Sequence, residues 1–165
     1  MADIENKGTV PSVFRLYSLC AIYRLDLADV LSWYGIDLGT LPADAALLDH
    51  WVPQANVVLD CCDNFPTRHA VNAACVRHRK PLVSGAALRW DAQISVYDVR
   101  QAQTPCYACV FPPETTVQEE RCATLGVFAP LVGIIGSMQA AEALKLLAGS
   151  GSSLAGRLQM LDARH

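Results

Sequence analysis

The stretch Leu59-Asp-Cys-Cys-Asp-Asn-Phe-Pro-Thr-Arg-His-Ala-Val-Asn-Ala-Ala-Cys75 decides the fold of this chain. It follows the apolar, partly β-branched run Asn56-Val-Val-Leu59, which predicts a buried strand. Apolar residues then recur at three- and four-residue spacing and predict one face of a helix: Ala70, Val71, Ala74 and Cys75. Open α/β sheets bind ligands at the carboxyl ends of their strands, where such helices begin. The stretch therefore predicts a ligand site at this junction.

Four polar residues are predicted to meet at the junction: Asp60, Asp63, Asn64 and Arg68. By residue type alone, Asp63 is well suited to cap the N-terminus of the helix. Arg68 lies one turn further on and is expected to pair with Asp63, to face a ligand or to be an ordinary surface charge. Asn64 either contributes to the ligand site or only forms the hydrogen bonds that the turn requires.

The composition indicates one globular domain and excludes several classes of protein. A length of 165 residues suffices for a core, and 18% charged residues is ordinary. A net charge of -3 gives no basic footprint for nucleic acid. The apolar run 127–148 is interrupted by Gln139, Glu142 and Lys145, which favours a buried amphipathic helix over a membrane span. Seven cysteines without an export signal indicate reduced thiols and a cytoplasmic protein.

The chain is predicted to contain a helical segment, residues 1–43, and an α/β domain, residues 44–165. In the second part the predicted order is a short helix at 45–51, a strand from Val57, the helix after it, strands at 81–85 and 93–97, a helix at 130–148 and a strand at 156–161. The first strand, helix and strand form a βαβ unit, so the two strands are expected to be parallel. Residues 101–125 are expected to be mostly irregular.

Six motifs in this order resemble the MoeB/ThiF/HesA family of ubiquitin-activating-like adenylyltransferases. They are Leu59–Arg68, Pro81-Leu-Val-Ser-Gly-Ala-Ala-Leu-Arg89, Gln93-Ile-Ser-Val-Tyr97, Pro105-Cys-Tyr-Ala-Cys109, Arg121-Cys-Ala-Thr-Leu-Gly126 and Pro130-Leu-Val-Gly-Ile-Ile-Gly-Ser-Met-Gln-Ala-Ala-Glu-Ala-Leu-Lys145. The resemblance covers about residues 44–165 and is nearest to the molybdopterin branch. It implies a Rossmann-like domain.

The resemblance also implies a reaction and its partners. Members of this family use ATP and magnesium to adenylate the C-terminal glycine of a ubiquitin-like sulfur carrier that ends in Gly-Gly, and they release pyrophosphate. The carrier then receives sulfur as a thiocarboxylate in molybdopterin or thiamine biosynthesis. The family forms homodimers and holds a structural zinc ion with two Cys-x-x-Cys pairs. Neither a membrane nor nucleic acid is an expected partner.

The family motifs assign roles to particular residues of this chain. Asp63 matches the magnesium ligand on the ATP phosphates, and it is predicted to act in catalysis together with Arg68 and to bind the nucleotide together with Asn64. Cys122 matches a cysteine that carries sulfur or forms a carrier adduct, with a free surface thiol as the alternative.

The remaining cysteines divide into a candidate zinc pair and candidate core residues. Cys106 and Cys109 match half of the zinc site, and their spacing also fits a redox pair or two buried thiols. Four others are expected to be small core residues: Cys20, Cys61, Cys62 and Cys75.

The sequence departs from the family at both ends. The Gly-rich loop that would hold the ATP phosphates is absent, and so is the second Cys-x-x-Cys. Residues 2–38 instead resemble the second half of a phage-repressor-like helix-turn-helix domain. The chain is thus expected to be a partial enzyme that aggregates or pairs through an exposed sheet edge. The alternatives are a non-catalytic carrier-binding or dimerising fragment, and a DNA-binding regulator using residues 1–35.

Overall fold

The computed structural model describes residues 45–113 and 125–165, which lie within one compact unit of the chain. The elements are α4 (Ala45–Trp51), the 3₁₀ turn η1 (Val52–Gln54), β1 (Val58–Asp60), α5 (Phe65–Arg77), β2 (Leu82–Leu88), β3 (Asp91–Tyr97), α6 (Tyr107–Val110), α8 (Ala129–Ala148) and β4 (Leu158–Asp162). Every strand and helix predicted within the described ranges is present. The predictions for residues 1–43, which include Cys20, and the prediction for Cys122 concern residues outside the described ranges.

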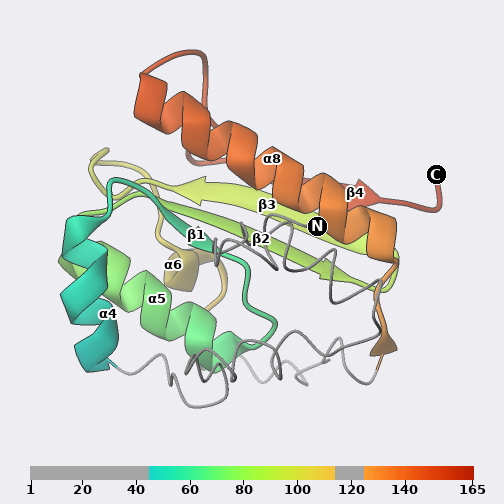
Figure 1. Ribbon diagram of the computed structural model, residues 1–165, viewed down its shortest axis with the longest axis horizontal. Coiled ribbons are helices and arrows are strands. Elements are labelled where there is room, and N and C mark those ends of the chain that lie inside the picture. Colours follow the sequence, from blue (N-terminus) through green and yellow to red (C-terminus); the bar gives the residue numbers. More distant parts are fainter. Residues whose placement is uncertain (1–44, 114–124) are drawn as a thin grey trace, which may run out of the picture. The chain divides into compact units, whose positions relative to one another are not determined.

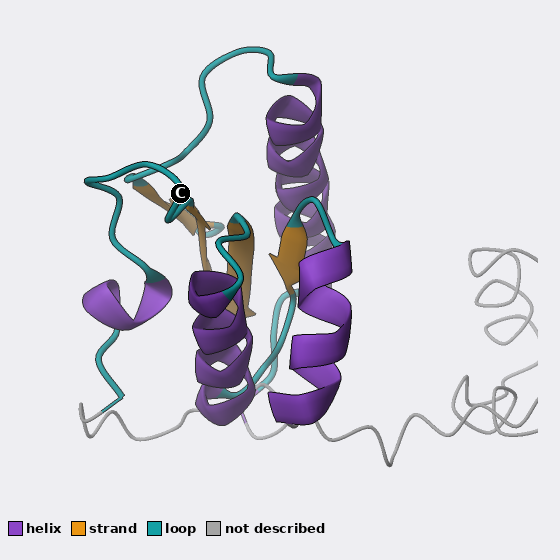
Figure 2. Cartoon of the chain, turned by 90° about the vertical axis from the view of Figure 1, so that its left-hand side faces the viewer, coloured by secondary structure: helices purple, strands orange, loops and turns teal. Residues whose placement is uncertain are grey.

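A four-stranded sheet forms the centre of the described part, in the order β1-β2-β3-β4. β1 and β2 are parallel, which confirms the predicted βαβ unit, whereas β3 runs antiparallel to both of its neighbours. α8 lies on one face of the sheet, and α4 and α5 lie on the other (Figure 1). Figure 2 shows α4 and α5 side by side. The predicted fold class, an α/β sheet flanked by helices, is confirmed.

The alternation of side chains along β2 and β3 produces two separate cores. Leu82 lies opposite Tyr97, and both belong to a cluster with Val71 of α5. The next pair, Val83 opposite Val96, points to the other face, because successive strand residues alternate. This second pair packs with residues of α8. β2 and β3 are therefore apolar on both faces, which explains the continuous apolar run Pro81-Leu-Val83.

Helix α8 begins and ends as its sequence predicts. Pro130 stands in the first turn, and Gly149 closes the helix with a φ of 61°. One face is buried against the sheet, including Leu131 and Ile135. Four large apolar side chains on this helix are exposed: Val132, Ile134, Leu144 and Leu147. Within the described residues, α8 is the one helix whose length and composition would allow it to cross a membrane.

Gly85 of β2 is a point of close approach between the sheet and α8. A Cβ atom placed on Gly85 would lie 2.5 Å from Cδ of Gln139 and 2.8 Å from Cγ2 of Ile135. Both distances are shorter than real carbon contacts, so a side chain here would have to displace the side chains of Gln139 and Ile135. The absence of a side chain at this position therefore sets how closely α8 packs.

We expect Gly85→Ala to lower the free energy of unfolding by about 1–3 kcal/mol, because the added methyl group overpacks the contact with α8. Urea unfolding followed by circular dichroism measures the change. Gly133→Ala is the matched control, since a Cβ there meets no atom within 4 Å. That control is expected to stabilise the protein by about 0.5–1 kcal/mol, because alanine favours a helix interior. Equal effects of the two substitutions would contradict the tight contact.

Candidate functional site

A buried ion pair joins the end of β1 to the first turns of α5. Asp60 Oδ2 accepts hydrogen bonds from Arg68 Nη1 at 2.9 Å and from Ser84 Oγ at 2.7 Å. Asp60 Oδ1 accepts the backbone N–H of Cys62 at 2.9 Å. The two charged side chains are only 1% and 8% exposed. Because both charges are out of water, the pair is stable only with these additional hydrogen bonds.

Both terminal nitrogens of the Arg68 guanidinium group take part in this arrangement. The group also donates to Ser84 Oγ at 3.1 Å, to the backbone carbonyl of Gly85 at 2.9 Å and to that of Cys62. Arg68 therefore pairs with Asp60 and not with Asp63, and it is not the exposed surface charge considered from the sequence. Its contacts fix the backbone on either side of the site. A direct catalytic role for Arg68 stays a prediction.

The turn between β1 and α5 leaves the carboxylate of Asp63 at the surface. Asn64, not Asp63, is the N-cap of α5: its side-chain oxygen accepts the N–H of Thr67 at 2.9 Å. The expectation that Asp63 caps the helix is thus wrong by one residue. Asp63 is exposed, and one of its oxygens lies 3.4 Å from Nδ2 of Asn64. Its carboxylate remains available to bind a ligand.

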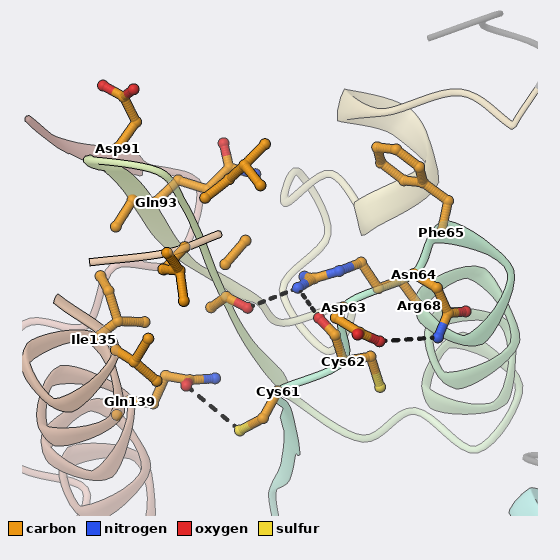
Figure 3. A pocket seen from close by; sticks show the side chains of 18 of the residues that line it. Cys61, Cys62, Asp63, Asn64, Phe65, Arg68, Asp91, Gln93, Ile135 and Gln139 are labelled. Carbon is orange, nitrogen blue, oxygen red and sulfur yellow. Dashed lines mark hydrogen bonds between the residues drawn. The ribbon is translucent and has the colours of Figure 1, made fainter. Parts of the chain in front are cut away.

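A pocket of about 540 Å³ opens at this end of the sheet, a size typical of small-molecule sites. Its walls come from the turn after β1, from β2 and β3, and from α8. Figure 3 shows Asp63 and Asn64 on one side of it and Ile135 and Gln139 on the other. The pocket thus lies at the carboxyl ends of β1 and β2, as the sequence predicted. Most of its lining is apolar, and Asp63 and Asp91 supply its carboxylates.

Gln139 lines the pocket, although no motif of the sequence indicated that it belongs to the site. It is 3% exposed, and its Nε2 donates to the backbone carbonyl of Asp60 at 2.8 Å and to that of Val83 at 3.3 Å. Its Oε1 accepts from Cys61 Sγ at 3.5 Å. The available signal was an amide at a position of the helix that faces the core.

The predicted zinc ligands Cys106 and Cys109 are brought together. Their sulfur atoms lie 3.5 Å apart, and Asn72 Nδ2 lies 3.7 Å from Sγ of Cys106. Partial burial of Cys106 opposes ionisation, but hydrogen bonds from Cys109, Asn72 and Ala108 outweigh it and lower the pKa of this thiol. Among the described residues no cluster of three or more metal-binding side chains exists. The pair thus supplies two zinc ligands and does not by itself complete a tetrahedral site.

The three other described cysteines differ from one another in exposure. Cys75 is buried, which confirms its predicted place in the core, and burial raises its pKa to about 12. Cys62 is half-buried, and its pKa is also raised to about 12 by burial and by the charge of Asp60. Cys61 is exposed and lines the pocket, so its assignment to the core was wrong.

The sheet and its flanking helices define the Rossmann-like class of α/β folds, and comparison with solved structures supports this fold. The crystal structure of MccB with ATP, from E. coli, superposes with a TM-score of 0.54 at 18% identity over 77% of this chain and 42% of that one. The structure of PaaA superposes with a TM-score of 0.55 at 12% identity over 76% of this chain and 45% of that one.

The sequence identifies the family. The model of the ThiF family matches residues 24–165, and the chain belongs to this family. It is 47% identical over 113 residues to the adenylyltransferase and sulfurtransferase MOCS3 of Xenopus laevis, covering 68% of this chain and 25% of that protein. For the same protein of Drosophila grimshawi the identity is 51% over 108 residues, covering 65% and 24%. The chain thus spans about a quarter of the length of these relatives.

The family match also bears on the N-terminal segment. It begins at residue 24 and takes in part of the segment that resembles a repressor fragment. The resemblance of residues 2–38 to a helix-turn-helix domain has no support and stays a prediction.

We expect Arg68→Met to lower the free energy of unfolding by about 3–5 kcal/mol, because it leaves the buried Asp60 carboxylate without its partner. Thermal or urea unfolding measures the loss. Arg77→Met is the matched control: Arg77 pairs with Asp49, and these side chains are 50% and 41% exposed. Exposed pairs contribute little, so the control should unfold like the wild type. A stable Arg68→Met variant would show that the pair does not hold the junction.

We expect Cys106 to be alkylated by iodoacetamide at lower pH than Cys62. The pKa of Cys106 is lowered, so its reactive thiolate forms first as pH rises, whereas that of Cys62 is raised to about 12. The two thiols suit the comparison because both are half-buried. Peptide mass spectrometry after short labelling at several pH values measures each rate. Equal pH profiles for the two cysteines would contradict the difference between their pKa values.

Proposed function

We propose that this chain takes part in the ATP-dependent adenylation of the C-terminal glycine of a ubiquitin-like sulfur-carrier protein, in molybdopterin or thiamine biosynthesis. The observation that carries the proposal is the exposed carboxylate of Asp63 at the mouth of the pocket, in a chain that belongs to the ThiF family. Relatives named as adenylyltransferases and sulfurtransferases support the same reaction.

The residues around Asp63 fit a magnesium ion bound together with substrate phosphates. Asp63 is exposed and is not used to cap α5, so its oxygens are free to face a ligand in the pocket. Magnesium commonly takes one or two carboxylates and completes its shell with phosphate oxygens and water. When bound, the ion would neutralise negative charge on the ATP phosphates. Asn64 and Arg68 would hold the turn that presents Asp63 to it.

In the proposed reaction a carboxylate oxygen of the carrier's last glycine attacks the α-phosphorus of ATP. The bond from that phosphorus to the bridging oxygen breaks, and pyrophosphate leaves with the electron pair. The chain would contribute mainly by orientation and by stabilising charge. The apolar walls of β2 and α8 would limit water, which competes with the carrier for the activated phosphorus.

Three further parts of the proposal rest on the family motifs. Cys122, which lies outside the described residues, is the candidate for carrying sulfur or forming a carrier adduct. Cys106 and Cys109 are candidates for zinc, but the described part of the chain supplies only these two ligands. We also propose the carrier and a second copy of the chain as partners, and the cytoplasm as the compartment.

One observation favours a second candidate, a module that binds the carrier without catalysis. Among the described residues that line the pocket, Arg68 is the only lysine or arginine, and its terminal nitrogens already donate to Asp60, Ser84 and the carbonyls of Cys62 and Gly85. No other cation of the described part therefore faces a triphosphate there. Such a module would bind the carrier and exchange no pyrophosphate.

Calorimetric titration of the full chain with ATP and magnesium tests the proposed function. We expect the wild type to bind and Asp63→Asn to bind at least about tenfold more weakly, because the substitution removes a metal ligand. Asp49→Asn is the matched control, since this exposed carboxylate belongs to a surface ion pair and not to the pocket. Equal affinity of the wild type and Asp63→Asn would contradict the assigned site.

Carrier-dependent exchange of labelled pyrophosphate into ATP then separates the two candidates. Exchange by the wild-type chain supports the adenylation reaction. Carrier binding without exchange supports the binding module.

A further inference from the structure

Gln139 fastens helix α8 to the backbone at the carboxyl ends of β1 and β2. Its Nε2 donates to the carbonyl of Asp60 at 2.8 Å and to that of Val83 at 3.3 Å, while its Oε1 accepts from Cys61 Sγ. Two of these partners belong to the segment 60–63, which ends in Asp63. A single side chain thus connects α8 to the strand end and to the turn that carries the exposed carboxylate.

Arg68 holds the same segment from the opposite face of the sheet. It comes from α5 and donates to the carbonyls of Cys62 and Gly85, whereas Gln139 comes from α8 and donates to those of Asp60 and Val83. Figure 3 shows the two side chains approaching the segment from different helices. The backbone between Asp60 and Asp63 is therefore held between two donors.

The surrounding packing is arranged around the amide of Gln139. The Cβ position of Gly85 is 2.5 Å from Cδ of Gln139, so β2 leaves this place empty and the amide fills it. A buried amide costs free energy unless its polar atoms are paired. Here both the nitrogen and the oxygen are paired. An apolar side chain would fill the same volume, so packing alone does not require glutamine.

We propose that Gln139 is a positioning residue that holds the segment 60–63 so that the Asp63 carboxylate faces the nucleotide and its metal ion. This role deepens the proposed function and rests on it. Gln139 acts through the backbone of Asp60 and the thiol of Cys61, without contacting the phosphates itself. Loss of its hydrogen bonds would free the segment to adopt other conformations and would weaken metal-dependent binding.

The first measurement is hydrogen exchange of the full chain with Gln139→Leu. We expect exchange in peptides covering residues 60–64 to accelerate about tenfold, because the segment loses one of its two anchors. Peptides from β3 should be little changed. Ser137→Ala is the matched control: this residue lies two positions before Gln139, on the exposed face of α8, and the one hydrogen bond of its side chain among the described residues is to the carbonyl of Gly133 in its own helix. Unchanged exchange at 60–64, or equal acceleration everywhere, would overturn the proposal.

The second measurement is the magnesium dependence of ATP binding. Gln139→Leu should raise the half-saturating magnesium concentration about tenfold, and Ser137→Ala should not. In the background of Asp63→Asn the same substitution should add no further loss, because both changes act on one group. Additive losses would mean that Gln139 acts elsewhere and would refute the positioning role.

Hydrogen exchange separates this proposal from the proposed function. If the wild-type chain binds no ATP, the proposed function fails and so does the role toward the nucleotide, while exchange at 60–64 still decides whether Gln139 anchors the segment. Gln139→Met, which keeps the length of the side chain, replaces Gln139→Leu if the latter does not fold. Failure of both variants to fold would show that Gln139 serves the core alone and would overturn the proposal.

Discussion

The buried ion pair between Asp60 and Arg68 is the interaction on which the rest of the site depends. A carboxylate and a guanidinium taken out of water lose hydration that their mutual attraction alone does not restore. Here Ser84, two backbone carbonyls and the N–H of Cys62 supply the missing hydrogen bonds. No buried side-chain nitrogen or oxygen of the described residues lacks a partner. The pair thereby joins β1, α5 and β2 at one point and fixes the turn between them.

The sequence predicted the elements around this point because each has a local signal. A few neighbouring residues suffice to indicate the strands and the apolar helix face after Arg68. The same holds for the ends of α8, which Pro130 and Gly149 mark. The sequence did not indicate the pairing, because Asp63 is nearer to Arg68 along the chain than Asp60, which is eight residues away, and only the fold selects Asp60. The contact between Gln139 and Asp60 spans 79 residues, and no local pattern could indicate it.

Helix α8 shows a second limit of sequence patterns. The sequence predicted a buried amphipathic helix, but apolar residues occur all around α8, so the pattern did not indicate which face the sheet covers. The structure buries the face with Leu131 and Ile135 and leaves Leu144 and Leu147 exposed. The polar residues were the more informative ones: Gln139 faces the sheet, and Glu142, also buried, accepts the N–H of Leu154 at 2.9 Å. A polar residue on a buried face therefore indicates a specific partner, even when the partner cannot be named.

Most polar groups of the site form hydrogen bonds or ion pairs that hold its structure together, whereas Asp63 contributes little to it. Asp60 and Arg68 hold each other, and Asn64 caps α5. Asp91, the other carboxylate of the pocket, lies 3.6 Å from Arg164. Asp63 is exposed, and within residues 45–113 and 125–165 its one hydrogen bond is the long contact to Asn64. An exposed carboxylate on a turn that is fixed by a buried ion pair is consistent with the ligand-binding role that we propose for Asp63. The rigidity of its neighbours keeps Asp63 in place while leaving its oxygens available.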